Sequence, residues 1–154
     1  MAITHRILDD LYEESFALLA IHSGMQGHSL AYTLNQSLKI QLKRAKEDLD
    51  FAEDIFFPYF EWKDEFNDVS WKLIANHSSK EVSIGSEGLF GSETAYKVHH
   101  LVPEHKDVDY FLKVEPEMSE VNETALKAIL SIPKVVTAYH VDAETTKSKQ
   151  NLIF

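Results

Sequence analysis

Three histidines and three acidic residues lie within the short stretch of residues 99–110. Imidazole and carboxylate groups together are the usual ligands of zinc, iron and manganese. His99 and His100 are neighbours, so in a strand they point to opposite faces, and only one of them could join Glu104 or His105. The spacing matches no known metal motif. We therefore keep His100, Glu104 and His105 as metal candidates but favour histidines exposed to solvent at a strand end, and we expect no bound cofactor.

Two acids in the same stretch, Asp107 and Asp109, fall on one face of an alternating run. Paired carboxylates can transfer protons when burial raises the pKa of one of them. We favour a plainer interpretation, in which both lie on the solvent face or Asp109 holds the bend at Pro103 through hydrogen bonds, because one face of an antiparallel sheet is commonly polar. An enzyme built on Glu104, Asp109 and Tyr110 around this bend is our third hypothesis.

A run of acids precedes this stretch, with nine acidic residues against Lys63 alone between Glu47 and Asp68. Charged runs are usually solvated. The alternative is a docking surface for a basic protein partner, with aromatic side chains as its anchors. The residues that would form this acidic aromatic surface are Tyr59, Trp62, Asp64, Glu65 and Asp68.

The whole chain has 154 residues, of which 44% are hydrophobic and 26% are charged. This composition is typical of one folded domain, which we place at residues 1–154. The formal net charge of -10 disfavours nucleic acid and anionic membranes as partners. The absence of cysteine excludes disulfides, thiolate catalysis and cysteine-ligated metal sites. Because no apolar run approaches the length of a membrane span, we expect a cytoplasmic protein.

Hydrophobic spacing predicts the elements that must position these groups. A short apolar run at 16–22 predicts a buried strand, and apolar steps of three or four residues after Ser29 predict a helix that ends near Asp48. We interpret 77–94 as the loosest region and 143–154 as a C-terminal tail. The other predicted elements are an aromatic strand at 55–63, strands at 69–75, 96–102, 108–114 and 135–141, and a helix at 119–132.

This order of strands and helices predicts an α+β fold. We expect an antiparallel-rich sheet of about five to seven strands with two main helices, in a ferredoxin-like or related sandwich. The aromatic strand is apolar on both faces, with Phe57 and Tyr59 on one side and Phe56, Phe60 and Trp62 on the other. The helices cannot cover both faces, so the second needs another subunit, an apolar ligand or the chain's own end, Leu152–Phe154, folded back.

Residues 102–110, with the sequence Val-Pro-Glu-His-Lys-Asp-Val-Asp-Tyr, resemble the signature of the IPExxxVDY family of small bacterial proteins. Val102 stands where the signature has isoleucine. The matching positions are Pro103, Glu104, Val108, Asp109 and Tyr110. The segments 31–35 and 151–154 also look similar, so the resemblance extends over most of the chain. It implies no activity, substrate or cofactor, but it directs attention to the bend.

Taken together, these features favour a non-enzymatic protein-binding or adaptor domain that docks a protein partner through its acidic aromatic surface, with a homodimer as a further option. The alternative is a small-molecule-sensing regulatory domain, because the unit formed by residues 110–141 resembles half of the ferredoxin-like modules that sense amino acids. A search for ligands that raise the melting temperature would separate the two hypotheses.

Overall fold

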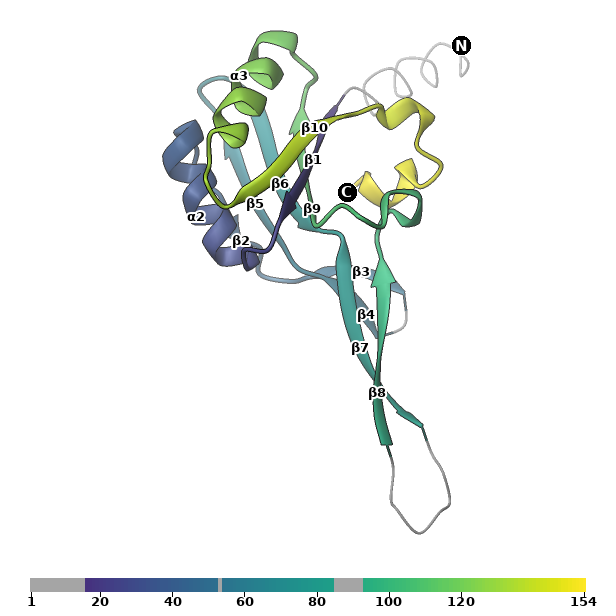
Figure 1. Ribbon diagram of the computed structural model, residues 1–154. Helices are drawn as coiled ribbons and strands as arrows, with labels where there is room; N and C mark the ends of the chain where they lie inside the picture. The colour runs from purple at the N-terminus through teal and green to yellow at the C-terminus, as the bar shows by residue number, and fades with distance from the viewer. Residues whose placement is uncertain (1–15, 53, 85–92) are drawn as a thin grey trace, which may run out of the picture.

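A computed structural model of the protein describes residues 16–52, 54–84 and 93–154. Within these residues an antiparallel six-stranded sheet forms the body of the molecule (Figure 1). From one edge to the other its strands are β10 (Val135–Val141), β1 (Ala17–Ser23), β9 (Tyr110–Glu115), β6 (Val69–Ala75), β5 (Tyr59–Asp64) and β2 (Lys43–Arg44). The fold is α+β with a mostly antiparallel sheet, as the sequence predicts.

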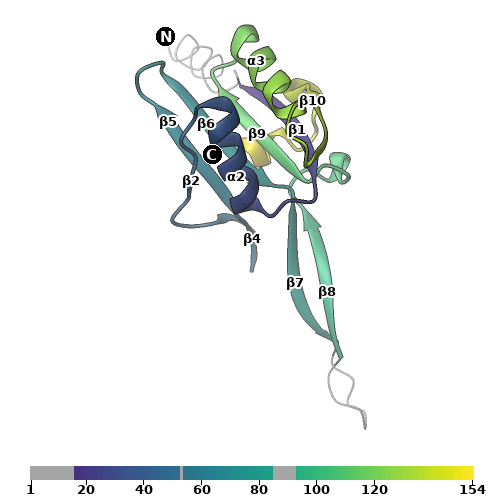
Figure 2. The same ribbon diagram turned by 60° about the vertical axis from the view of Figure 1, so that its left-hand side comes forward.

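Two smaller sheets accompany the main one in the described part of the chain. The first pairs β3 (Leu49–Ala52) with β4 (Ile55–Phe57), and the second pairs β7 (His77–Ile84) with β8 (Glu93–His100). The helices α2 (Gly27–Leu38) and α3 (Ser119–Leu130) lie side by side on one face of the main sheet (Figure 2). Short 3-10 helices occupy Pro103–His105 (η1), Ala143–Thr145 (η2) and Lys149–Leu152 (η3). No described helix has the length and apolar character needed to cross a membrane.

The face of the sheet under the helices holds the larger core. Alternate residues of β1, such as Leu19 and Ile21, point to this side and are fully buried. Leu30 and Leu34 of α2 and Ile129 of α3 pack against them, as expected for helices with an apolar stripe four residues apart. The buried stripes therefore anchor both helices to the central strands.

The opposite face is covered by the chain itself. Leu18 of β1 and Phe111 of β9 lie fully buried on this side, under the segment 101–108 and under Leu152 of η3. The ring of Phe154 meets that of Tyr59 edge-on, with 5.1 Å between ring centroids. Residues 143–154 are thus a packed cover rather than the polar tail considered from the sequence.

Helix α2 ends about ten residues earlier than predicted, which corrects the expected end near Asp48. Lys39 takes a left-handed conformation with φ 58° and stops the helix after Leu38. The side chain of Asn35 then accepts a hydrogen bond from Leu42 N at 2.8 Å and donates one to Leu42 O at 3.1 Å. Ile40 and Leu42 are buried as alternate residues of extended chain. Apolar residues four positions apart, such as Leu38 and Leu42, lie on one face both in a helix and in an extended chain. The spacing therefore could not locate the end of the helix.

The predicted aromatic strand 55–63 is interrupted at Pro58, so β4 and β5 belong to different sheets. Proline has no N–H to donate to a ladder, although the carbonyl of Pro58 still accepts a hydrogen bond from Ala75 N at 3.1 Å. The predicted face of Phe56 is wrong, because Phe56 is exposed on the β3–β4 hairpin, but the later aromatic residues separate as predicted. Tyr59 packs on the second core, while Trp62 packs on the core beneath the helices.

Residues 77–94 were predicted to be the loosest region, but they contain β7 and the start of β8, which pair into a long ribbon. Residues 85–92 lie outside the described residues. Strands β7 and β8 pair in continuous register from His77 opposite His100 to Ile84 opposite Glu93. This ribbon, which we call the arm, projects away from the main sheet (Figures 1 and 2). Near its base Ser78 Oγ donates a hydrogen bond to Phe56 O of β4 at 2.6 Å.

Candidate functional site

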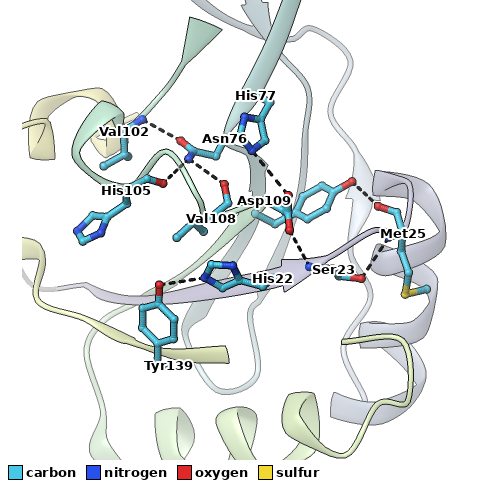
Figure 3. A network of polar contacts seen from close by, with 11 residues as sticks. His22, Ser23, Met25, Asn76, His77, Val102, His105, Val108, Asp109 and Tyr139 are labelled. Atoms are coloured by element: carbon cyan, nitrogen blue, oxygen red, sulfur yellow. Dashed lines mark hydrogen bonds and ion pairs between the residues drawn. The ribbon is translucent and has the colours of Figure 1, made fainter. Parts of the chain in front are cut away.

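Residues 101–110, here called the bend, connect the arm to β9 and are held in place by Asn76 (Figure 3). The Asn76 amide donates to His105 O and Val108 O, both at 2.9 Å, and its oxygen accepts from Val102 N at 2.8 Å. Asn76 is completely buried between β6 and β7. The bonds to Val102 N and Val108 O satisfy buried backbone groups, and the third adds to the bond that His105 O already accepts from Val108 N, so Asn76 fixes the path of the bend.

Asp109 secures the end of β1 rather than the bend itself. Its Oδ2 accepts a hydrogen bond from Ser23 N at 2.9 Å, and its Oδ1 lies 3.7 Å from His77 Nε2 at the base of the arm (Figure 3). Ser23 Oγ in turn donates to Lys134 O and accepts from Met25 N. The carboxylate of Asp109, the residue before β9, thus links this point of the chain to β1 and to the arm.

Tyr110 holds the approach to α2. Its hydroxyl donates a hydrogen bond to Met25 O at 2.7 Å, just before the helix begins. Burial, and after it the negative charge of Asp109, raises the pKa of Tyr110 above its usual value. The hydroxyl therefore keeps its proton and acts as a hydrogen-bond donor.

Glu104 points to the end of the chain instead. Its carboxylate accepts hydrogen bonds from Ser148 N at 2.6 Å and from Ser148 Oγ at 2.8 Å. Partial desolvation acts to raise the pKa of Glu104, but the hydrogen bonds from its own backbone N–H and from Ser148 hold that pKa below the usual value. Of the three residues of the enzymatic hypothesis, Asp109 and Tyr110 therefore engage the same segment, through Ser23 and Met25, whereas Glu104 engages the distant Ser148.

The histidine candidates are likewise separated. The rings of His100 and His77 meet edge-on at 4.7 Å, and His105 lies against Phe111. Burial, followed by the nearby positive charges of His77 and Lys106, lowers the pKa of His100. In the part of the chain that the structure describes, no group of three or more His, Cys, Asp or Glu side chains is placed to hold a metal ion. His100, Glu104 and His105 are thus not brought together as ligands.

The acidic aromatic surface predicted from the sequence is divided between the two faces of the sheet. Tyr59 contacts Phe154 and Trp62 packs on the helix side, while both half-buried side chains also line a pocket along β2, β5 and β6. Asp64 accepts hydrogen bonds from Phe66 N and from both the side chain and the backbone of Asn67. The side-chain bond from Asn67 is the main cause of its lowered pKa. Asp64 thus caps the β5–β6 turn, in which Glu65 and Asp68 are exposed.

Different aromatic residues are exposed near the arm. Phe56 is 46% exposed and lies opposite Asp50 in the β3–β4 hairpin. Phe51 is 40% exposed and meets Phe57 edge-on at 5.5 Å. Val98 is half exposed on β8. The sequence predicted Phe56 on the same strand face as Phe60 and did not single out Phe51 or Val98, because their exposure depends on the break at Pro58 and on the projecting arm.

A cavity of about 390 Å³ opens where α2 begins above β5, β6 and β9. Its apolar lining comes from Pro58, Phe60, Leu73 and Ala75. Arg44 of β2 and His28 of α2 also line it. No sequence motif indicates this cavity, because its residues come from segments scattered between positions 27 and 110.

Compared with protein-family models, with curated proteins and with solved structures, the chain matches none.

Proposed function

We propose that this protein is a protein-binding module, and that it presents the arm and the neighbouring β3–β4 hairpin to a basic protein partner. The arm carries the proposal. It is a two-stranded ribbon paired over its described length, and it stands away from the six-stranded sheet (Figure 1). An isolated two-stranded ribbon is only marginally stable in water. A partner that packs along the arm would supply the contacts that the body of the protein does not.

The residues beside the arm support a basic partner. Asp50 and Phe56 face the same side of the β3–β4 hairpin, and Phe51 adds an exposed ring at its rim. Exposed aromatic side chains beside carboxylates suit a partner that presents lysine or arginine next to apolar groups. The formal charge of -10 on the chain adds a long-range attraction for such a partner.

The bend supports a structural role for the IPExxxVDY-like residues. Glu104, Asp109 and Tyr110 each bond to a segment distant in sequence, and Val108 is buried. We interpret the motif as a clamp that joins β1, α2 and the chain end to β9. The proposed membership of the IPExxxVDY family would then reflect a shared fold and carry no catalytic implication.

The body of the protein fits a ferredoxin-like unit extended at one side. Strands β1, β6, β9 and β10 with α2 and α3 follow one another in the order β-α-β-β-α-β, and both helices lie on one face. Strands β5 and β2 would then extend this unit beyond β6. On this proposal the arm is an insertion between β6 and β9.

The test uses a shortened arm. Residues 80–97 are replaced by Asn-Gly, which joins Ser79 to its register partner Val98 through a two-residue turn. Tagged wild type and variant are used to capture partners from the native cells, and captured proteins are identified by mass spectrometry. We expect a basic partner in stoichiometric amount with wild type and its loss with the shortened arm. Retention by the shortened arm, an acidic partner, or no partner would contradict the proposal.

A pair of matched variants locates the surface further. Asp50→Lys with Phe56→Ser changes the hairpin beside the arm, and Glu65→Lys with Phe66→Ser makes the same kinds of change in the β5–β6 turn. Phe66 is 96% exposed, so both pairs alter surface groups at opposite ends of β6. We expect the first pair to weaken capture at least about tenfold and the second to leave it unchanged. Molar mass measured by light scattering identifies a second copy of the chain as the partner, which would also contradict a basic partner.

A further inference from the structure

We propose that the cavity at the start of α2 binds a small organic anion, a carboxylate carried on an apolar body. This inference goes beyond the protein-binding function, because the cavity residues belong neither to the arm nor to the β3–β4 hairpin. A volume of about 390 Å³ lies within the range of small-molecule sites and well above the space of one water.

The floor of the cavity is apolar and comes from the strands. Phe60 of β5 and Leu73 and Ala75 of β6 lie on the helix side of the sheet, and Pro58 closes the end beside β4. These groups offer van der Waals contact and no hydrogen bonds to a ligand's body. The Tyr110 ring forms another wall, but its hydroxyl is already bonded to Met25 O. The apolar part of a ligand is therefore expected to lie against the strands.

The polar groups of the cavity are basic. Arg44 and His28 line it, and among the described residues no acidic side chain does. Gly27, the first residue of α2, also lines it, so the positive end of the helix dipole faces the same space. A methyl group at Gly27 would lie 3.2 Å from Cε2 of Phe60, so glycine permits the helix to begin this close to the ring. This lining favours an anion over a neutral or cationic molecule.

Arg44 has an internal competitor. Its Nη2 contacts the carboxylate of Asp48, and its Nη1 donates to Ala45 O and Tyr59 O, both at 3.3 Å. The guanidinium also lies 5.8 Å from the centre of the Phe60 ring. A ligand carboxylate would replace or share the contact with Asp48, because arginine can hold carboxylates through several N–H groups. Asp48 thus marks the type of group that Arg44 binds and should limit the affinity for a ligand.

The test uses two sets of probes, each with one apolar body and head groups of different charge. The aromatic set is 4-phenylbutyrate, 4-phenylbutyramide and 4-phenylbutylamine, and the aliphatic pair is octanoate and octanamide. Binding to the full chain is measured by calorimetry and located by amide chemical shifts. Ligands of about 10–12 non-hydrogen atoms should bind with a Kd of about 0.1–1 mM. We expect at least one carboxylate to bind about tenfold more tightly than its amide, with shifts at residues 27–28, 44 and 73–75.

Four variants separate the contributions. Arg44→Met should reduce carboxylate affinity about tenfold to that of the amide, and Lys43→Met, the same charge change on the neighbouring residue of β2, should leave it unchanged. Asp48→Asn should raise carboxylate affinity several-fold and leave amide affinity as it is. Ala75→Leu should fill the cavity and abolish binding of every probe. Retained binding of the amide by Arg44→Met also shows that this variant is folded.

Several outcomes would overturn the proposal. They are equal affinity for carboxylate and amide, tighter binding of the amine, chemical shifts confined to other parts of the chain, or no binding of either carboxylate at concentrations up to about 10 mM. A carboxylate affinity that falls rather than rises in Asp48→Asn would show that Asp48 does not compete with the ligand for the Arg44 guanidinium, and this too would overturn the proposal. Shortening the arm should not alter probe binding, so failure of the protein-binding proposal and failure of this one are distinguishable.

Discussion

The bend and the arm are adjacent in the chain and both contain histidines, but they use their polar groups in opposite ways. In the bend, the side chains of Glu104, Asp109 and Tyr110 each bond to another segment of the chain. In the arm, the backbone bonds of β7 are made to β8, and Ser78 makes a side-chain bond to the hairpin at the base. The bend is bound into the fold, whereas the arm extends from it.

This contrast changes the meaning of a motif. The residues whose types suggested chemistry are the ones most engaged in holding elements together. The hydrogen bonds of Asp109 and Glu104 hold each carboxylate in a fixed position against another segment of the chain. The arm and the β3–β4 hairpin, which carry no recognisable motif, present the exposed apolar groups instead. We therefore expect substitutions in the bend to change stability and substitutions in the arm to change binding.

The largest expected effect follows from Asn76→Ala. The substitution leaves Val102 N and Val108 O without their partner in a buried position, while His105 O keeps its hydrogen bond from Val108 N. Each unsatisfied buried group costs about 1–3 kcal/mol, so we expect a loss of about 3 kcal/mol or more in the free energy of unfolding. Urea denaturation measures it. Asn151→Ala, which removes a single bond to Leu101 O, is the control and should cost about 1 kcal/mol. Equal costs would show that Asn76 does not organise the bend.

Asp109→Ala should have the next largest effect. It removes a charge-assisted hydrogen bond to Ser23 N and the contact with His77, which together should contribute about 1.5–3 kcal/mol to the free energy of unfolding. Asp107→Ala makes the same substitution at an exposed position of the bend and should cost less than about 0.5 kcal/mol. If the two substitutions lower the free energy of unfolding equally, the bend does not depend on Asp109 for its stability. Its carboxylate would then again be a candidate functional group.

Elements with a clear period and strong boundaries could be predicted from the sequence. Strand β10 was predicted at its observed limits, because β-branched residues follow Pro133 in a short run. Helix α3 was predicted within about two residues from its apolar stripe and the same proline. The end of α2 and the break at Pro58 were not predicted, because the first depends on a bond between Asn35 and Leu42 and the second on which sheet each half joins.

Less of the site could be predicted from the sequence, because its contacts join residues that are far apart in the chain. Asn76 looked like one more polar residue of an alternating strand, yet its partners lie about 26 to 32 residues away. Tyr59 and Trp62 were placed correctly on opposite faces, but only the packed chain end shows that Phe154 contacts Tyr59. The cavity combines Arg44 with Leu73 and Tyr110, which no local pattern connects.

A smaller effect is expected from Glu104→Gln, and it should depend on pH. The hydrogen bonds from Ser148 favour the charged carboxylate and lower its pKa in the folded state relative to about 4.5 in the unfolded chain. The stabilisation is therefore fully present above that pH and is lost as the pH falls through the folded-state pKa. Because Glu104 is exposed, we expect a difference of at most about 1 kcal/mol near neutral pH. Urea denaturation between about pH 7 and pH 3 should show this difference shrinking towards zero, with Glu123→Gln as the exposed control on α3. A difference that stays constant over this range would exclude a contribution from the Glu104 charge.

The smallest effect on stability is expected from the shortened arm, in which Asn-Gly replaces residues 80–97. Where the structure describes it beyond its base, the arm pairs β7 with β8 in continuous register and projects away from the main sheet (Figure 1). The pairs from His77 to Ser79 with Val98 to His100 remain, and so do the Ser78 bond to Phe56 O and the contact of His77 with Asp109. We therefore expect the free energy of unfolding to change by less than about 0.5 kcal/mol, as for substitutions away from packed features. A loss above about 2 kcal/mol would place the arm within the cooperative fold, and its removal could then no longer separate binding from folding. An unchanged stability combined with a lost partner would instead confirm that the arm contacts the partner. A segment that adds nothing to the stability of its own fold and yet is required for capture must act through the partner.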